Sequence, residues 1–201
     1  MMFLVSLFLL LFTHLLEAEG GQLILMRHGQ AEHNLLGIYN SNPLLPQYKP
    51  SHLTKEGEAQ VLHTAERLLK QGFHPDTIHA VYVSPLPRTQ ETALILVKAG
   101  VISEKTIVLD KRLMEVQFWD LEGMPIIRPW MNIFSDLYHT ETQEQLFRRI
   151  SGFATERFGS KIDKHILVIT HAYIAQLLIK FLKNEDNTRI ETAQAIVMPL
   201  P

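Results

Sequence analysis

The stretch "LILMRHGQAEHN", residues 23–34, changes character after its first four residues. Those four are apolar, as in a strand that a parallel sheet buries on both faces. Arg27, His28 and Gly29 follow at once: a cation, an imidazole and a residue whose backbone can approach a neighbour closely. Such a sequence is typical either of an ordinary strand end with a turn or of an anion site in which the imidazole reacts. The rest of the chain must distinguish the two.

Strands and helices are predicted to alternate along the chain from residue 22 onward. Short apolar runs predict strands, and apolar residues at helical spacing between polar caps predict helices. The predicted strands are residues 22–27, 78–85, 106–110, 165–170 and 191–200. The predicted helices are residues 54–72, 87–98, 140–158 and 172–182, and irregular segments span 34–51 and 111–140. This order predicts an α/β fold, a three-layer sandwich with a mainly parallel central sheet flanked by helices.

The first long helix has clear signals at both ends. Thr54 is a good N-cap residue, and Gly72 is a typical residue at which a helix stops. An apolar stripe is expected to face the core and consists of Ala59, Leu62, Ala65, Leu68 and Leu69.

Composition bounds the class of protein. The 201 residues suit one domain, residues 21–201, with a small insertion at 111–140. The apolar fraction of 46% and charged fraction of 20% are those of a globular protein. A net charge of −2 without a Lys/Arg block argues against nucleic acid as a partner. Because the chain has no cysteine, disulfides, thiolate metal sites and cysteine nucleophiles are excluded.

The first 20 residues differ in composition from the rest. Residues 1–16 are apolar except for Ser6, Thr13 and His14. This length fits the core of a signal peptide better than a membrane-spanning helix, which needs about 20 apolar residues. We expect residues 1–20 to be a signal peptide or an N-terminal membrane anchor, and the protein to be exported, periplasmic or secreted. A buried first helix is the alternative, which the lack of a polar face disfavours.

Reactive side chains follow the ends of the predicted strands. Arg27 and His28 end the first strand, and Arg88 starts the helix after the second. Glu115 follows the third strand, and His171 ends the fourth. Ligands of open parallel sheets bind beyond the carboxyl ends of the strands. The sequence therefore predicts that these five side chains share one site.

Five segments carry a resemblance to a known family. They are "LMRHGQAEHN", "HLTKEGEAQ", "VYVSPLPRTQETA", "LMEVQFWDLEG" and "VITHA", and they span Leu23 to His171. In this combination and order the chain resembles the histidine phosphatase superfamily, the phosphoglycerate mutase-like branch with an RHG motif. The resemblance implies a phosphoglycerate mutase-like fold and a phosphomonoester hydrolase that acts through a phosphohistidine.

The resemblance also implies a role for each site residue. His28 would attack phosphorus, and Glu115 would act as general acid and then general base. The phosphate group would be held by Arg27, Arg88, His171 and Asn34. Asn40 stands where related enzymes place another amide donor. A neutral imidazole needs a carbonyl that fixes its tautomer, but the sequence does not identify one. Neither a metal nor a cofactor is expected, and the expected partner is a small phosphorylated substrate.

Single residues of this set have more ordinary interpretations. An isolated arginine or glutamate is more often a surface ion-pair residue, and an isolated strand-end histidine is more often structural. Ser84, Thr89 and Thr92 are interpreted as a turn and helix-start cap. No role is predicted for the other histidines, which include His33. The aromatic residues of the insertion could line the substrate site or only pack against one another: Phe118, Trp119, Trp130, Phe134 and Tyr138.

Three departures from the family pattern concern the shape of the site. Trp119 stands where relatives usually have glycine, Ala172 follows His171 where glycine is usual, and Ser51-His52 replaces an aspartate before the first long helix. The short insertion favours hydrolysis over phosphoglycerate mutase-type transfer. Two further hypotheses stay open: a catalytically silent relative that binds a phosphorylated ligand, and an interaction module held on a membrane by its N-terminus.

Overall fold

The computed structural model describes residues 20–126, 138–159, 164–185 and 188–200. The predicted signal peptide or anchor, residues 1–20, lies outside this part of the chain except for Gly20. Trp130 and Phe134 of the predicted insertion also lie outside it. Within the described residues, no helix is both long and apolar enough to span a bilayer.

Five strands and five α-helices form the described part of the fold. The strands are β1 (Gln22–Arg27), β2 (Ile78–Val83), β3 (Ile107–Leu109), β4 (His165–Thr170) and β5 (Ala195–Pro199). The α-helices are α2 (Glu32–Leu36), α3 (Lys55–Lys70), α4 (Pro87–Lys98), α6 (Gln143–Phe158) and α7 (Ala172–Lys183). Short 3-10 helices are η2 (Glu104–Thr106), η3 (Lys111–Leu113) and η4 (Trp119–Leu121).

The strands form one sheet in the order β3-β2-β4-β1-β5. Neighbours among β1 to β4 pair in parallel, and β5 pairs with β1 in antiparallel fashion. In the register, Arg27 at the end of β1 lies opposite Thr170 at the end of β4. The predicted mainly parallel sheet is therefore confirmed, and the residues after β1 and β4 start side by side.

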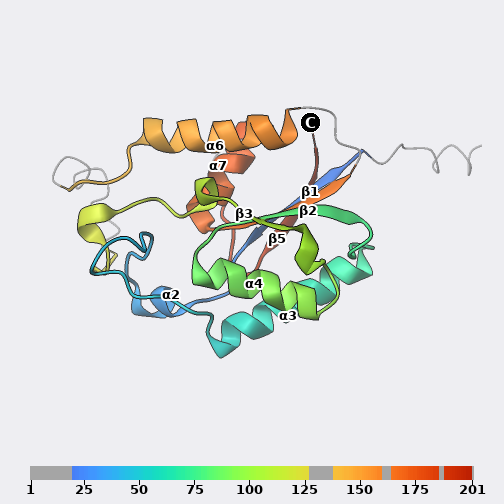
Figure 1. Ribbon diagram of the computed structural model, residues 1–201, viewed down its shortest axis with the longest axis horizontal. Coiled ribbons are helices and arrows are strands. Elements are labelled where there is room, and N and C mark those ends of the chain that lie inside the picture. Colours follow the sequence, from blue (N-terminus) through green and yellow to red (C-terminus); the bar gives the residue numbers. More distant parts are fainter. Residues whose placement is uncertain (1–19, 127–137, 160–163, 186–187, 201) are drawn as a thin grey trace, which may run out of the picture.

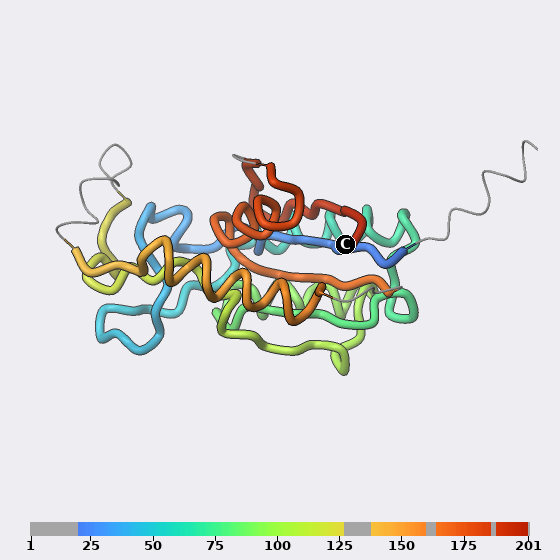
Figure 2. The backbone as a smooth tube through the Cα atoms, turned by 90° about the horizontal axis from the view of Figure 1, so that it is seen from above, coloured from blue at the N-terminus to red at the C-terminus, as the bar shows by residue number. Residues whose placement is uncertain are grey.

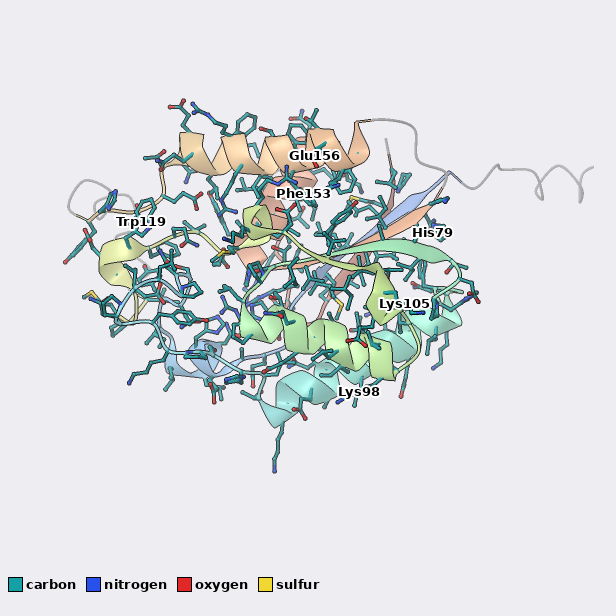
Figure 3. All side chains as sticks on the ribbon, viewed as in Figure 1. His79, Lys98, Lys105, Trp119, Phe153 and Glu156 are labelled. Atoms are coloured by element: carbon teal, nitrogen blue, oxygen red, sulfur yellow. The ribbon has the colours of Figure 1, made fainter. Side chains whose placement is uncertain are left out.

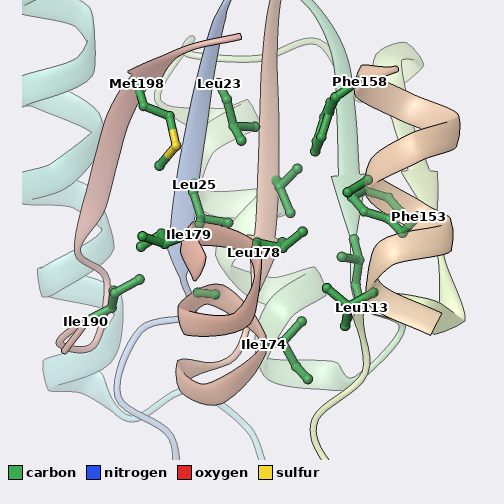
Figure 4. Packing of buried hydrophobic residues seen from close by; sticks show 14 of the residues in the cluster. Leu23, Leu25, Leu113, Phe153, Phe158, Ile174, Leu178, Ile179, Ile190 and Met198 are labelled. Carbon is green, nitrogen blue, oxygen red and sulfur yellow. The ribbon is translucent and has the colours of Figure 1, made fainter. Parts of the chain in front are cut away.

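Helices cover both faces of the sheet, which gives the predicted three layers (Figure 1). Leu23 and Leu25 of β1 face α6 and α7, where they pack with Phe153 and Leu178 (Figure 4). The alternate residues of β1 face α3 and α4 and contact the second cluster. Because both faces are covered, β1 is apolar at four consecutive positions, as the sequence indicated.

The α3 helix confirms its predicted cap but not its predicted apolar stripe. Thr54 Oγ1 accepts from the N–H of Gly57, as a capping threonine does. Leu62 is 48% exposed, whereas Val61 is fully buried, so the stripe that we expected is wrong at this position. Ala59 and Leu69 are exposed as well. The buried face of α3 consists of Gly57, Val61, Thr64, Ala65 and Leu68.

Close contact between two glycines explains this rotation of α3. A Cβ at Gly29 would lie 2.6 Å from Gly57 O and 2.8 Å from a methyl carbon of Val61. A Cβ at Gly57 would lie 2.0 Å from Gln30 O. The chain after β1 thus presses directly against the first turn of α3, which requires glycine on both sides.

The connections that follow the parallel strands gather at one end of the molecule. Figure 2 shows residues 37–53 and 117–126 at this end, far from the start of β1. In Figure 3, Trp119 marks the same end, and His79 near the start of β2 lies at the opposite one. The short α2 helix lies at this end too, and its residues 34–36 fall in the segment 34–51 that is predicted to be irregular.

Candidate active site

His28 directly follows β1, and its backbone is held on both sides. Its N–H donates to Thr170 O at 3.0 Å, and its carbonyl accepts from Ala193 N–H at 2.9 Å. Ala193 adopts a left-handed φ of 57° here, a conformation that costs a non-glycine residue on the order of 1 kcal/mol. The buried imidazole is therefore held where the carboxyl ends of the paired strands β1 and β4 lie side by side.

Two contacts define the tautomer of the His28 imidazole. Nδ1 lies 2.7 Å from Gly29 O, and a carbonyl oxygen can only accept. Nε2 accepts from Arg88 Nε–H at 3.3 Å, and a guanidinium can only donate. Nδ1 therefore carries the hydrogen and Nε2 the lone pair, as a nitrogen nucleophile requires. Gly29 O is the carbonyl whose existence, but not identity, followed from the sequence.

The surroundings of His28 keep its ring neutral. Burial lowers the pKa of His28 well below its usual value, and the positive charge of Arg88 lowers it further. The hydrogen bond to Gly29 O acts in the opposite direction without offsetting burial. Nε2 is thus unprotonated at neutral pH.

Arg88, the second residue of α4, is completely buried and held in one orientation. Its Nη1 donates to Asn40 Oδ1 and its Nη2 to Asn40 O, both at 2.9 Å. Contacts with the described residues engage three of its five N–H donors, so two are available to an anion. Burial lowers the pKa of Arg88 to about 10, against the opposing effect of Glu115. The guanidinium therefore stays charged at neutral pH.

A buried carboxylate fixes the loop that carries Asn40. Glu122 accepts from Ser41 N–H at 2.9 and 3.0 Å through its two oxygens, and Oε2 also accepts from Ser41 Oγ at 3.0 Å and from Asn42 N–H at 3.1 Å. The rings of Tyr39 and Phe118 pack with centroids 4.4 Å apart. The loop after α2 and the segment after Glu115 are therefore joined, and Phe118 has a packing role.

His171 lies beside His28 and offers one unpaired ring nitrogen. The ring centroids are 5.1 Å apart in an edge-on arrangement. Ser84 Oγ lies 2.8 Å from His171 Nε2, and it accepts from Leu86 N–H at 3.5 Å. Ser84 Oγ can donate to Nε2 while it accepts from Leu86 N–H, and in that arrangement the ring hydrogen of His171 lies on Nδ1. Nδ1 is buried without a hydrogen-bond partner among the described residues, so an anion in the site would satisfy it.

Arg27, the last residue of β1, brings a second guanidinium to the site. Its Nη1 donates to Ile190 O at 2.9 Å, and its buried Nε has no partner among the described residues. Burial lowers the pKa of Arg27, and the charge of Glu115 opposes that effect. Like His171, Arg27 holds an unsatisfied donor at the carboxyl end of the sheet.

Glu115 is brought to the site by the segment after η3. Leu113 O accepts from Thr170 Oγ1 at 2.8 Å, which joins this segment to the end of β4. Glu115 Oε1 accepts from Val116 N–H at 3.0 Å. Burial raises the pKa of Glu115, against the smaller lowering effects of Val116 N–H, Arg88, Arg27 and Arg149. The protonated form is therefore favoured more than in an exposed glutamate, which suits a general acid.

The Asn34 side chain makes hydrogen bonds with residues at the start of α2. Its Oδ1 accepts from Ala31 N–H at 2.9 Å, and its Nδ2 lies 2.9 Å from His33 Nε2. Because the amide must donate to His33 Nε2, the ring hydrogen lies on Nδ1, which is 2.9 Å from Ser51 Oγ. The predicted phosphate contact of Asn34 stays a prediction, and the structure shows a cap and a partner of His33 instead.

Three side chains with a part in the site had no predicted role in it. His33 packs with its ring centroid 5.6 Å from that of His28, and burial lowers its pKa to about 2. Ser84 was interpreted as a turn residue and is the partner of His171. Glu122 was not singled out. The rule that ligands bind beyond the carboxyl ends of parallel strands identifies residues next to the strands. It does not identify partners from loops that are distant in the sequence.

The local side-chain bonds predicted for two threonines are present, but the predicted side-chain cap is wrong, because the N-cap of α4 is Leu86 without a side-chain cap hydrogen bond. Thr89 Oγ1 donates within the turn before α4, to Ser84 O at 2.7 Å or Leu86 O at 2.6 Å. Thr92 Oγ1 donates to Arg88 O at 2.8 Å and accepts from Gly29 N–H at 3.2 Å.

Trp119 stacks on His139 with centroids 4.2 Å apart. Among the described residues, no cluster of three or more His, Asp or Glu side chains could hold a metal ion.

The sequence model of the histidine phosphatase superfamily (branch 1) matches residues 23–196. The chain belongs to this superfamily. The resemblance inferred from the five sequence segments is thereby confirmed. The RHG segment, residues 27–29, stands at the end of β1, the first strand of the matched region.

Curated members of the histidine phosphatase superfamily match this chain over different lengths. Some match most of the chain, and others match about half of it. Sedoheptulose 1,7-bisphosphatase of Saccharomyces cerevisiae is 32% identical over 178 residues, which cover 75% of this chain and 63% of the yeast protein. A 5''-phosphoribostamycin phosphatase of Niallia circulans is 30% identical, covering 84% of this chain and 81% of that protein. A 2,3-bisphosphoglycerate-dependent phosphoglycerate mutase of Corynebacterium kroppenstedtii is 32% identical over 53% of this chain. The chain spans 39% of that mutase, and less than two thirds of the yeast protein.

Solved structures of the superfamily have the same fold. A mycobacterial glucosyl-3-phosphoglycerate phosphatase in complex with VO3 superposes with a TM-score of 0.67 at 20% identity, covering 88% of this chain and 92% of that one. A structure named mycobacterial hydrolase 1 gives 0.69 at 17% identity, covering 89% of this chain and 91% of that one. These likenesses confirm the predicted fold class.

Proposed function

We propose that this chain is a phosphomonoester hydrolase that acts through a phosphohistidine on His28, with Glu115 as general acid and base. The observation that carries the proposal is the tautomer of His28. Its Nδ1–H is directed to Gly29 O, so that Nε2 presents a lone pair beside the Arg88 guanidinium. A residue that only bound phosphate would act better as a donor than as a neutral base.

The first step transfers the phosphoryl group to the enzyme. Arg88 Nε–H turns from His28 Nε2 to a phosphoryl oxygen, and the freed Nε2 lone pair forms a bond to phosphorus while the bond from phosphorus to the ester oxygen breaks. Protonated Glu115 gives its proton to that oxygen, and the alcohol leaves. In the second step Glu115 takes a proton from water, the oxygen of that water bonds to phosphorus, and the bond to Nε2 breaks. Phosphate leaves, and His28 and Glu115 return to their starting states.

Positive and neutral donors stabilise the charge on the phosphoryl oxygens. Arg88 has N–H groups available beside His28, and Arg27 Nε and His171 Nδ1 are buried without partners among the described residues. Preorganised donors of this kind act on the charge that the transition state spreads over the non-bridging oxygens. Asn34 Nδ2 donates one of its two N–H groups to His33, and the second is the one that would join these donors.

The proposed substrate is a small phosphorylated molecule. Support comes from the relatives that match most of the chain, a sedoheptulose bisphosphatase and a phosphoribostamycin phosphatase. Hydrolysis is favoured over mutase-type transfer because the mutase likeness covers only about half of the chain. A silent relative that binds a phosphorylated ligand is the second candidate, and the pairing of a nucleophile with a proton donor disfavours it.

Export remains part of the proposal for the whole chain. The apolar composition of residues 1–16 supports a signal peptide or membrane anchor. The test separates cells and medium into membrane, soluble and extracellular fractions and measures the molecular mass of the protein found in each. Full-length protein in the soluble cytoplasmic fraction would contradict export.

Turnover of p-nitrophenyl phosphate by the full chain and by protein that starts at Gly20 tests the activity. We expect hydrolysis in the acidic to neutral range, with His28→Ala reduced to background. Equal inactivity of wild type and His28→Ala would favour the silent relative. A chelator is expected to leave the rate unchanged, and activity that it abolishes and a divalent ion restores would contradict the proposed chemistry.

A further inference from the structure

A partly buried ion pair packs against the segment that carries Glu115. Arg149 projects from α6, and Glu141 precedes the Thr142 cap of that helix. Arg149 Nε lies 2.5 Å from Glu141 Oε1, and Nη2 lies 2.8 Å from Oε2. The side chains are 18% and 7% exposed. This fork of two parallel contacts fixes the relative orientation of both groups.

The same two residues hold the backbone on both sides of Glu115. Arg149 Nη1 donates to Arg112 O at 2.5 Å, and Nη2 donates to Glu115 O at 3.4 Å. Glu141 Oε2 accepts from Gln117 N–H at 3.2 Å, and Glu141 N–H donates to Gln117 O at 2.7 Å. The ion pair thus engages backbone groups before, at and after the proposed acid.

The Glu115 carboxylate itself has few fixed partners. The Val116 N–H at 3.0 Å is its hydrogen-bond donor within the described part of the chain. Gln117 Nε2 lies 2.8 Å from Glu115 O and 3.2 Å from Ser41 O, which restrains the backbone from the other side. The direction of the Glu115 carboxyl group therefore depends on the conformation of the backbone of residues 112–117.

We infer that the Arg149–Glu141 pair is a positioning device that aims the Glu115 carboxyl group at the ester oxygen. The inference rests on the proposed function, because it assigns Glu115 the role of proton donor. Among the described residues neither member of the pair is hydrogen-bonded to His28 or to the phosphate donors; the Arg149 charge reaches them only at a distance, where it lowers the pKa of Glu115 and of His171. Loss of the pair should therefore impair proton transfer to the leaving group and leave phosphate binding intact.

A purely structural role is the competing explanation, since the pair also joins α6 to η3. A buried ion pair is weak support for stability, because the cost of removing two charges from water offsets much of their attraction. Removing one partner would leave an unpaired buried charge and destabilise the fold. The test therefore uses the double variant Arg149→Met/Glu141→Gln, which leaves no unpaired charge, and Arg149→Lys, which keeps the charge but not the fork.

Arg148 provides a matched control on the same helix. It pairs with Glu144 across one turn, and its side chain is 78% exposed. Arg148→Met removes a neighbouring arginine of the same size without touching the Glu115 segment. The thermal unfolding midpoint of every variant shows which of them are folded at the assay temperature.

The experiment measures single-turnover formation of the phosphoenzyme with two substrates. Glycerol phosphate has a poor leaving group that needs a proton, and 2,4-dinitrophenyl phosphate has a good one that does not. We expect the double variant to slow the glycerol phosphate reaction at least about tenfold and the dinitrophenyl reaction less than about twofold, since a general acid supplies 10²–10⁴-fold. Arg149→Lys should show the same selectivity more weakly, and Arg148→Met should match wild type.

Two results would overturn the inference. Equal slowing of both substrates by the double variant and by Arg149→Lys would assign the pair to the scaffold alone. Wild-type rates with glycerol phosphate in the folded double variant would show that the Glu115 segment needs no such support. Failure of the proposed function gives a different result: wild type forms no phosphoenzyme with either substrate.

Discussion

Arg88 donates its Nε–H to Nε2 of His28 at 3.3 Å, while its outer nitrogens are held by Asn40. One guanidinium therefore orients the attacking nitrogen, lowers the pKa of its ring and lies beside it, where its free N–H groups can donate to phosphoryl oxygens. Because Asn40 is fixed through the Ser41–Glu122 contacts, this orientation is set before a substrate arrives. Attack then requires the Nε2 lone pair to leave the Arg88 Nε–H, whose hydrogen becomes available to a phosphoryl oxygen.

Replacing Arg88 with lysine should separate charge from geometry. An ammonium group keeps the charge but cannot reach His28 and Asn40 at once in the planar fork. We expect kcat/KM for a phosphomonoester to fall on the order of 10²-fold, as for loss of an oriented transition-state donor. Arg67→Lys on the exposed face of α3 is the control and should be unchanged. An Arg88→Lys rate within twofold of wild type would show that charge alone suffices.

Glu115→Gln should reveal general acid catalysis through leaving-group dependence. Glutamine cannot supply a proton, so phosphoenzyme formation from an alkyl phosphate should slow by about 10²-fold or more. The reaction of an activated aryl phosphate should slow much less. Rapid-quench measurement of both first steps distinguishes the two, and equal slowing of both would remove Glu115 from this role.

The pH profile should have its alkaline limb at the ionisation of Glu115. Burial raises the pKa of Glu115, so the acid form persists above the range of an exposed glutamate and is lost as the pH rises. Burial lowers the pKa of His28, so the nucleophile stays neutral below pH 6.5. The ratio of wild-type to Glu115→Gln rates for an alkyl phosphate cancels the ionisation of the substrate, which occurs near pH 6. This ratio should fall with rising pH, and a constant ratio would contradict the assignment.

His33 should make the fold less stable in acid. Burial lowers the pKa of His33 from 6.5 to about 2. Between these values the unfolded chain binds a proton that the folded protein does not, so the free energy of unfolding falls as the pH falls. The fall approaches about 1.4 kcal/mol per pH unit for one such group. Urea titrations at pH 7 and pH 5 should show a smaller fall for His33→Gln than for wild type. His63→Gln, at an exposed position of α3, should keep the wild-type difference.

The sequence was most informative where function and local structure depend on the same residues. Parallel strands end at one edge, so His28, Arg88 and His171 could be placed together from the chain order alone. The rotation of α3 could not be predicted, because the contact between Gly29 and Gly57 decides whether Val61 or Leu62 is buried. Helical periodicity alone permits either.

The partners of the site residues were the least predictable feature. Asn34 was assigned to phosphate by resemblance, yet its amide is shared between Ala31 and His33. Asn40 was placed among the amide donors; its Oδ1 accepts from Arg88 and its Nδ2 donates to Lys49 O, and its contact with phosphate stays a prediction. Both outcomes depend on loops that meet only in the folded protein. There the Glu122 carboxylate accepts a hydrogen bond from Ser41, which lies about 80 residues earlier in the sequence. The spacing of residues along the sequence does not predict such contacts.

The central claim is that phosphorus becomes bonded to Nε2 of His28. Protein mixed with a ³²P-labelled phosphomonoester and quenched during turnover tests it directly, because a nitrogen–phosphorus bond is stable in base and labile in acid. The account predicts base-stable label on the peptide that contains residue 28, absent from His28→Ala. Label that survives acid, or label retained in His28→Ala, would contradict it.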